Sequence, residues 1–181
     1  MAWQIDTAHS QIQFSVRHMM LAKVRGQFDK FSGTVHLDEA NPAASTVDIQ
    51  IEAASINTRE PQRDGHLKSP DFFHVEKHPT LTFKSKRVDV KDSHHAVLIG
   101  DLTIRDVTKE VALDVEYMGQ SKTPFGTTNA GFEATTKINR KDWGLTWNAV
   151  LETGGVAVGD EITVTIDLEV VKQPDAAPVS A

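Results

Sequence analysis

The 181-residue sequence predicts an all-β fold, an antiparallel barrel or sandwich formed as one domain. Three observations support this prediction. Apolar and polar residues alternate along many short segments, which places successive side chains on opposite faces of a β-strand. Segments rich in Gly, Pro, Asn and Asp separate these stretches, as turns do in all-β proteins. No long run with helical periodicity interrupts them.

Four segments show the alternation most clearly, and each is expected to form a strand: 11–18, 47–52, 110–117 and 161–170. In the first of them, Ile12, Phe14, Val16 and His18 share the apolar face. Weaker alternation predicts further strands at 31–37, 80–90, 96–104 and 129–139. Strands with one apolar and one polar face belong to antiparallel sheets that are solvated on one side.

The segment Asn57–His78 breaks the strand pattern, and its prolines and glycine limit any helix there to a turn or two. Four aromatic residues in this segment and in INRKDWGLTW are expected to pack against the barrel and to plug or border its ends: Phe72, Phe73, Trp143 and Trp147. The Pro-rich end, 173–181, is expected to be a disordered tail, so the domain spans 1–172.

Composition excludes several classes of protein. The formal net charge of -6 argues against general nucleic-acid binding, and the absence of cysteine excludes disulfides and thiolate metal sites. No window holds the roughly 18 apolar residues that a membrane-spanning helix needs. The N-terminus, MAWQIDTAHSQIQF, has no basic region followed by an apolar run. We therefore expect no secretory signal and a cytoplasmic location.

Signals for metal binding and catalysis are weak. His74 and His78 have the spacing of two ligands on one helical face, but Val75 stands where the zincin motif has glutamate, and Pro79 disfavours a helix at His78. Solvated loop histidines are the alternative, and we predict no metal site. The sequence contains no G-x-S-x-G elbow, and GGVAVGD lacks the Lys-Ser/Thr ending of a phosphate loop. We predict no catalytic residues and no enzymatic activity.

The segment RHMMLAKVRG combines cations with apolar residues in an otherwise acidic protein. Its cations are candidates for holding an anionic head group: Arg17, Lys23 and Arg25. Met19 and Met20 can adapt to an irregular apolar ligand. His18 is either satisfied by a backbone carbonyl or makes a polar contact at the mouth of a cavity. The alternative for the whole segment is a solvated loop that closes one end of the barrel.

Eight motifs occur in order over most of the chain: WQIDTAHSQIQFSVRH, GQFDKFSGTV, SINT, RDGHLKSPDFF, HPTLTFKS, GDLTIRDVTKEVAL, INRKDWGL and VGDEITVTIDLE. Together they resemble the YceI-like family of lipocalin-like, polyisoprenoid-binding proteins. One departure is Arg105-Asp106, where the family usually has a glycine ahead of Val-Thr, and we expect it to change a turn.

The resemblance implies an extended, lipocalin-like antiparallel β-barrel of about eight strands around an apolar pore, with a short helical insertion. It implies a non-enzymatic binding or carrier protein for a long apolar lipid. That lipid would be a polyisoprenoid such as an isoprenoid quinone or a prenyl pyrophosphate. The family brings no catalytic residues and no cofactor besides the bound lipid, and its members often form homodimers.

The apolar strand faces supply the candidate wall residues: Phe14, Val16, Ile49, Ile51, Phe83, Leu102, Leu113, Val115, Phe132, Ile138, Val164 and Ile166. A long, thin lipid suits such a pore because burial stabilises by about 25 cal/mol per Å² of apolar surface. Two alternatives stay open. An enzyme acting on a lipid or quinone would need polar residues inside the barrel, and a stress-response interaction module would have a packed core.

Overall fold

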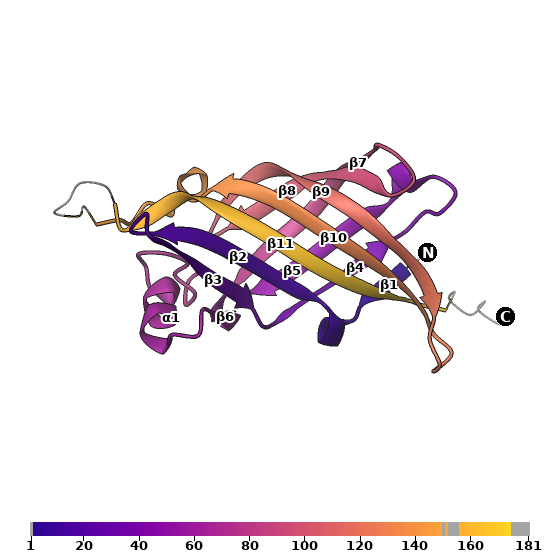
Figure 1. Cartoon of the computed structure of the whole chain (residues 1–181), viewed down its shortest axis with the longest axis horizontal. Helices are drawn as coiled ribbons and strands as arrows, with labels where there is room; N and C mark the ends of the chain where they lie inside the picture. Colours follow the sequence, from indigo (N-terminus) through magenta and orange to yellow (C-terminus); the bar gives the residue numbers. More distant parts are fainter. Residues whose placement is uncertain (1, 150, 152–155, 175–181) are drawn as a thin grey trace.

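The computed structural model describes residues 2–149, 151 and 156–174, and it shows a closed antiparallel barrel with one short helix (Figure 1). Its strands are β1 (Ala2–Ile5), β2 (Gln11–His18), β3 (Ala22–Phe28), β4 (Phe31–His36), β5 (Thr46–Glu52), β6 (Ile56–Asn57), β7 (Thr80–Val90), β8 (His95–Ile104), β9 (Val107–Lys122), β10 (Thr128–Asn139) and β11 (Val158–Lys172). The helix is α1 (Pro61–Lys68), and four 3-10 turns are η1 (Thr7–His9), η2 (Pro42–Ala44), η3 (Ala53–Ser55) and η4 (Arg140–Trp143). The all-β prediction is confirmed.

The predicted strand count of eight is also confirmed, because three strands of the barrel are interrupted. β1 and β2 both pair with β11, so they lie end to end along it. β3 and β4 pair with β2 and β1, and β5 and β6 pair with β4 and β3. Read in this way, the eleven hydrogen-bonded segments form one closed eight-stranded barrel.

The connections between strands gather at the two ends of the barrel's long axis. One end holds the β2–β3 turn, α1 and the segment after β10, and we call it the helix end (left in Figure 1). The other holds the β4–β5 and β7–β8 connections together with the start of β1 and the end of β11, and we call it the terminus end (right in Figure 1). The strand registers require this division, since antiparallel neighbours reverse direction at each turn.

The helical insertion is short because its sequence sets both where the helix begins and where it ends. Glu60 accepts hydrogen bonds from the backbone N–H groups of Gln62 and Arg63 at 3.2 and 2.7 Å, and Pro61 occupies the first turn. Asp64 ties the helix to the barrel, because its carboxylate accepts from the backbone N–H of Thr58 at 2.9 Å. The predicted turn or two of helix is thus an eight-residue helix.

The departure from the family motif at Arg105 lies in the turn between β8 and β9. Arg105 has φ 58°, in the left-handed region where glycine would be unstrained. The turn remains short, and the β8–β9 ladder continues to Ile104 and Val107. Among the described residues, no helix has the length and apolarity that crossing a membrane requires. Most of the predicted tail, 175–181, lies outside the described residues.

Candidate functional site

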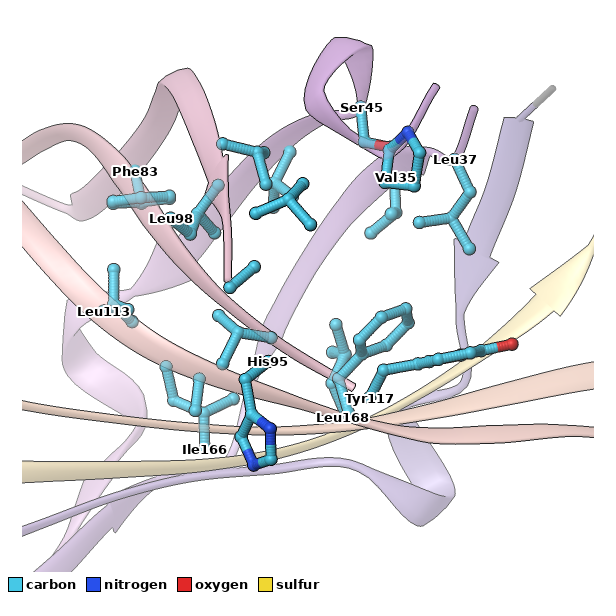
Figure 2. A pocket seen from close by; sticks show the side chains of 18 of the residues that line it. Val35, Leu37, Ser45, Phe83, His95, Leu98, Leu113, Tyr117, Ile166 and Leu168 are labelled. Atoms are coloured by element: carbon cyan, nitrogen blue, oxygen red, sulfur yellow. The ribbon is translucent and has the colours of Figure 1, made fainter. Parts of the chain in front are cut away.

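A cavity of about 610 Å³ lies inside the barrel (Figure 2). Its walls come from inward-facing residues of consecutive strands, and Figure 2 shows Phe83, Leu98, Leu113 and Ile166 around a common space. The period-two alternation causes this arrangement, since every second side chain of a barrel strand points inward. A cavity of this size and apolar character falls within the range of small-molecule sites in proteins.

Nine of the predicted wall residues line this cavity: Ile49, Ile51, Phe83, Leu102, Leu113, Val115, Phe132, Val164 and Ile166. Three others do not, namely Phe14, Val16 and Ile138. The sequence prediction also left out inward residues with the same alternation, including Ile12, Val47, Tyr117 and Leu168. These could have been found from the sequence, because they share apolar faces with residues that were chosen.

The mouth of the cavity is at the terminus end. All of the solvent-exposed lining residues belong to the β4–β5 connection, to the region where β7 turns into β8, or to the last part of β9: Asp38, Glu39, Pro42, Val90, Asp92, Ser93, His94, His95 and Gln120. Tyr117 lies just inside, with its ring 5.3 Å from that of Phe132. Sequence reasoning missed the loop residues, because connections carry no periodicity that reveals which way they face.

The segment that follows β10 packs against the barrel at its helix end. Trp143 is only 2% exposed, and its indole N–H donates to the carbonyl of Leu102 at 2.9 Å, directly behind a lining residue. Arg140, 3% exposed, fixes this segment by donating to the carbonyls of Leu145, Trp147 and Gly159 at 2.6, 2.9 and 2.8 Å. Burial lowers the pKa of Arg140 despite the nearby Asp160, but an arginine remains charged.

Aromatic rings pack in two groups at the helix end. Phe14 packs on Phe28 at 5.7 Å between ring centroids, and Phe28 packs edge-to-face on Phe73 at 5.9 Å. Gly26 makes room for Phe14, since a Cβ there would lie 2.4 Å from the ring. A second group joins α1 to the segment after β10, with His66 4.7 Å from Trp147 and 5.1 Å from Phe72. The predicted packing of Phe72, Phe73, Trp143 and Trp147 is confirmed.

The predicted head-group residues do not reach the mouth. Arg17, His18, Met19 and Met20 lie at the end of β2 and in the β2–β3 turn, at the helix end, and Lys23 and Arg25 lie on β3. None of these six residues lines the cavity. Arg25 borders a separate depression on the polar face of β2, β3 and β11, together with Ser15 and Thr163. Whether any of them binds a head group stays a prediction.

The mouth is acidic. Its lining includes Asp38, Glu39 and Asp92 but no lysine or arginine among the described residues. The backbone N–H groups of His94 and His95 donate to Asp92 at 2.8 Å each, and with the His95 ring they hold the pKa of Asp92 below its usual value. Asp92 is therefore ionised at neutral pH. Such a rim repels anions and offers His and Tyr side chains as hydrogen-bond partners.

A group of potential metal ligands lies elsewhere, on the seam between β1 and β11. Asp6, His9 and Glu169 bring ligand atoms within 4.8 Å of one another. The His9 ring nitrogen Nδ1 lies 2.7 Å from Asp6 and 3.6 Å from Glu169, so these groups already satisfy one another. The two histidines singled out from the sequence, His74 and His78, meet edge to face with ring centroids 5.9 Å apart.

Comparisons with known proteins agree with this architecture. A sequence model of the YceI-like domain matches residues 3–170. A UPF0312 protein of Staphylococcus aureus is 39% identical over 158 residues, covering 87% of this chain and 90% of that protein. The crystal structure of a Campylobacter jejuni YceI protein is similar, with a TM-score of 0.76 and 31% identity, over 87% of this chain and 90% of that one.

Two more distant structures share the fold. BcnA of Burkholderia cenocepacia has a TM-score of 0.80 at 22% identity, over 91% of this chain and 98% of that one. A polyisoprenoid-binding domain from Saccharophagus degradans has a TM-score of 0.69 at 16% identity, over 95% of this chain and 98% of that one. Because the domain match extends over nearly the whole barrel, the chain belongs to the YceI-like family.

Proposed function

We propose that this protein binds the chain of a long apolar lipid, a polyisoprenoid, in its barrel cavity and acts as a carrier rather than as an enzyme. The observation that carries the proposal is the apolar cavity, reached through a mouth at the terminus end. The Saccharophagus degradans domain of the same fold is described as polyisoprenoid-binding. Burial of the lipid chain would supply the affinity without any hydrogen bond in the cavity.

An uncharged head group suits this cavity better than a diphosphate. A polar head group cannot enter the apolar interior without losing its water contacts, so it would rest at the mouth. There it would meet Asp38, Glu39 and Asp92, which repel an anion, and His95 and Tyr117, which can donate hydrogen bonds. A prenol or an isoprenoid quinone fits this rim. The cations of the β2–β3 region lie at the other end of the barrel.

The distribution of polar groups in the cavity supports a binding role over catalysis. Away from the mouth, the described polar lining is Thr136, whose hydroxyl donates to the carbonyl of Ala112 at 2.8 Å. A reaction on the buried chain would need paired acid and base groups beside it. The cavity likewise disfavours an interaction module with a packed core, because such a core has few voids larger than a water molecule.

Filling the cavity should abolish lipid binding. Ala134 lines the cavity and is 9% exposed, so Ala134→Trp would place a large ring inside. The matched control is Ala112→Trp, which adds the same ring to the exposed face of β9. We expect Ala134→Trp to weaken geranylgeraniol binding by about tenfold or more and Ala112→Trp to leave it unchanged.

The measurement is a titration with geranylgeraniol, together with native mass spectrometry of the protein as purified. Failure of the wild-type protein to bind or co-purify with any lipid would refute the proposal. Equal binding by both tryptophan variants would refute the cavity as the site. Tighter binding of geranylgeranyl diphosphate than of geranylgeraniol would refute the uncharged head group alone.

We also propose a homodimer, as the family resemblance implies. Sedimentation equilibrium would give the mass of the assembly, and a monomer at all concentrations would overturn this part.

A further inference from the structure

The β2–β3 turn exposes three consecutive large apolar side chains. Met19, Met20 and Leu21 are 38%, 66% and 82% exposed, and they lie at the tip of the hairpin that β2 and β3 form. The turn is held in shape, because the Leu21 N–H donates to the His18 carbonyl at 3.0 Å and the Met19 N–H to the Ala157 carbonyl at 2.9 Å. A fixed turn that holds contiguous apolar surface in water marks an interaction site.

The strands behind this tip carry three positively charged side chains. Arg17 and Lys23 are directly opposite each other on β2 and β3, and Arg25 follows on the same face of β3. All three are exposed, and none forms an ion pair with a carboxylate in the described part of the chain. Like charges placed opposite each other destabilise a sheet, and the protein as a whole has a net charge of -6.

The fold and the cavity leave these features without a role. Met20 and Leu21 contribute little to the core, since more than half of each residue is exposed, and Met19 is exposed by more than a third. The cations lie away from the mouth of the cavity, so they cannot meet a head group held there. An apolar tip with a basic collar is complementary to a surface that is apolar inside and negatively charged outside. An anionic lipid bilayer has that structure.

We propose that the β2–β3 hairpin docks the protein on an anionic membrane surface, with Met19, Met20 and Leu21 inserted among the lipids and Arg17, Lys23 and Arg25 on the head-group phosphates. This docking does not depend on the proposed cargo. It would set the barrel with its helix end on the membrane and its cavity mouth at the far end, accessible from solvent (Figure 1).

A second exposed apolar residue provides the matched control. Phe125, 91% exposed, lies in the β9–β10 connection at the terminus end, away from the basic collar. If exposed apolar surface alone caused membrane binding, Phe125 would contribute as much as Leu21. If the hairpin is the docking element, Phe125→Ser changes nothing.

The experiment is vesicle flotation with the full chain, using phosphatidylcholine vesicles with or without phosphatidylglycerol. We expect binding to the anionic vesicles only. The variant Met20→Ser, Leu21→Ser should bind weakly. The variant Arg17→Gln, Lys23→Gln, Arg25→Gln should lose about a hundredfold in affinity, because each cation near an anionic surface contributes about fivefold. Phe125→Ser should bind as wild type.

Thermal melts and a geranylgeraniol titration of each variant separate loss of docking from loss of fold or cavity. The hairpin variants should melt and bind geranylgeraniol like the wild type. The proposal is overturned if the wild type does not float with anionic vesicles, if it floats equally with neutral ones, or if the hairpin variants keep full binding. Loss of binding in Phe125→Ser would also overturn it, by placing the contact at the other end.

Discussion

The two ends of this barrel are built from the same strands and differ in what their connections do. At the helix end, Trp143 is 2% exposed and Arg140 is 3% exposed, and aromatic rings from three segments pack together. At the terminus end, the connections carry exposed polar residues such as Asp38, Asp92 and His95, and the cavity opens between them. Buried residues and packed rings occupy the helix end, whereas the barrel cavity opens at the terminus end.

This difference teaches that alternation alone does not make a cavity. Inward-facing apolar residues occur at both ends of the barrel. Where another segment packs on them they form part of the hydrophobic core, and where no segment does they form the wall of the cavity. Phe14 and Phe132 illustrate the point, because both are inward phenylalanines on long strands. Phe14 meets Phe28 and the backbone at Gly26, while Phe132 meets Tyr117 and the cavity.

The largest effect is expected from removing the buried ring of Trp143, which lies behind the lining residue Leu102 at the helix end. Trp143→Ala should lower the free energy of unfolding by about 3–5 kcal/mol, since it deletes a fully packed ring. It should also speed the release of bound geranylgeraniol through the helix end. Urea unfolding and dissociation kinetics measure the two effects. Trp143→Phe is the control that keeps most of the ring and loses the hydrogen bond to Leu102, at a cost of about 1 kcal/mol.

The matched pair Phe14→Ala and Phe132→Ala tests the contrast directly. Phe14→Ala should cost up to about 3–5 kcal/mol and leave geranylgeraniol affinity unchanged, because its ring packs on Phe28 and does not line the barrel cavity. Phe132→Ala should cost about half as much and weaken binding, because part of its ring faces the cavity. Equal destabilisation with equal binding would mean that the two ends are packed alike.

A smaller effect is expected at the mouth. Replacing Asp38 and Glu39 by Asn and Gln should change the free energy of unfolding by less than about 0.5 kcal/mol, since both are exposed. The affinity for geranylgeranyl diphosphate should rise about two- to fivefold, with geranylgeraniol binding unchanged. Asp114→Asn on the outer face of β9 is the control. If the relative affinities for geranylgeraniol and geranylgeranyl diphosphate stay unchanged, the charges at the mouth do not select the head group.

The smallest effect is expected from Asp6 and His9, beside the terminus end. Their hydrogen bond raises the pKa of His9 and lowers the pKa of Asp6. Because its pKa is raised, His9 stabilises the fold below about pH 6.5. This stabilisation is lost as the pH rises through the pKa that His9 has in the folded protein. Because its pKa is lowered, Asp6 stabilises the fold above about pH 3.9. This stabilisation is lost as the pH falls through the pKa that Asp6 has in the folded protein.

The contribution of this pair is therefore greatest near pH of about 5. His9→Gln should lower the melting temperature most at that pH and least at alkaline pH. The control, His36→Gln, should melt like the wild type at every pH. A constant difference at all pH values would show that His9 acts through packing instead of charge.

The sequence by itself determined which residues face inward along the regular strands. Val115, Val164 and Ile166 line the cavity because a strand repeats every two residues, and this local geometry can be read without a structure. The short helix was equally predictable, because Pro61 occupies its first turn and Pro70 follows its end at Lys68. The all-β class follows from the same local rules.

Only the tertiary structure decided which inward residues border open space and where the mouth lies. Phe14 and Ile138 have the same alternation as Phe132, yet neither lines the barrel cavity. Phe14 packs on Phe28 and borders the separate depression beside Arg25. The segments that pack at the helix end are distant in sequence from the strands they cover, so no local pattern reveals the contact. Local pattern also does not reveal at which end of the barrel a residue lies, so a place at the mouth was plausible for Arg17, Lys23 and Arg25. Strand order and register, which depend on pairings across the whole chain, place them at the opposite end.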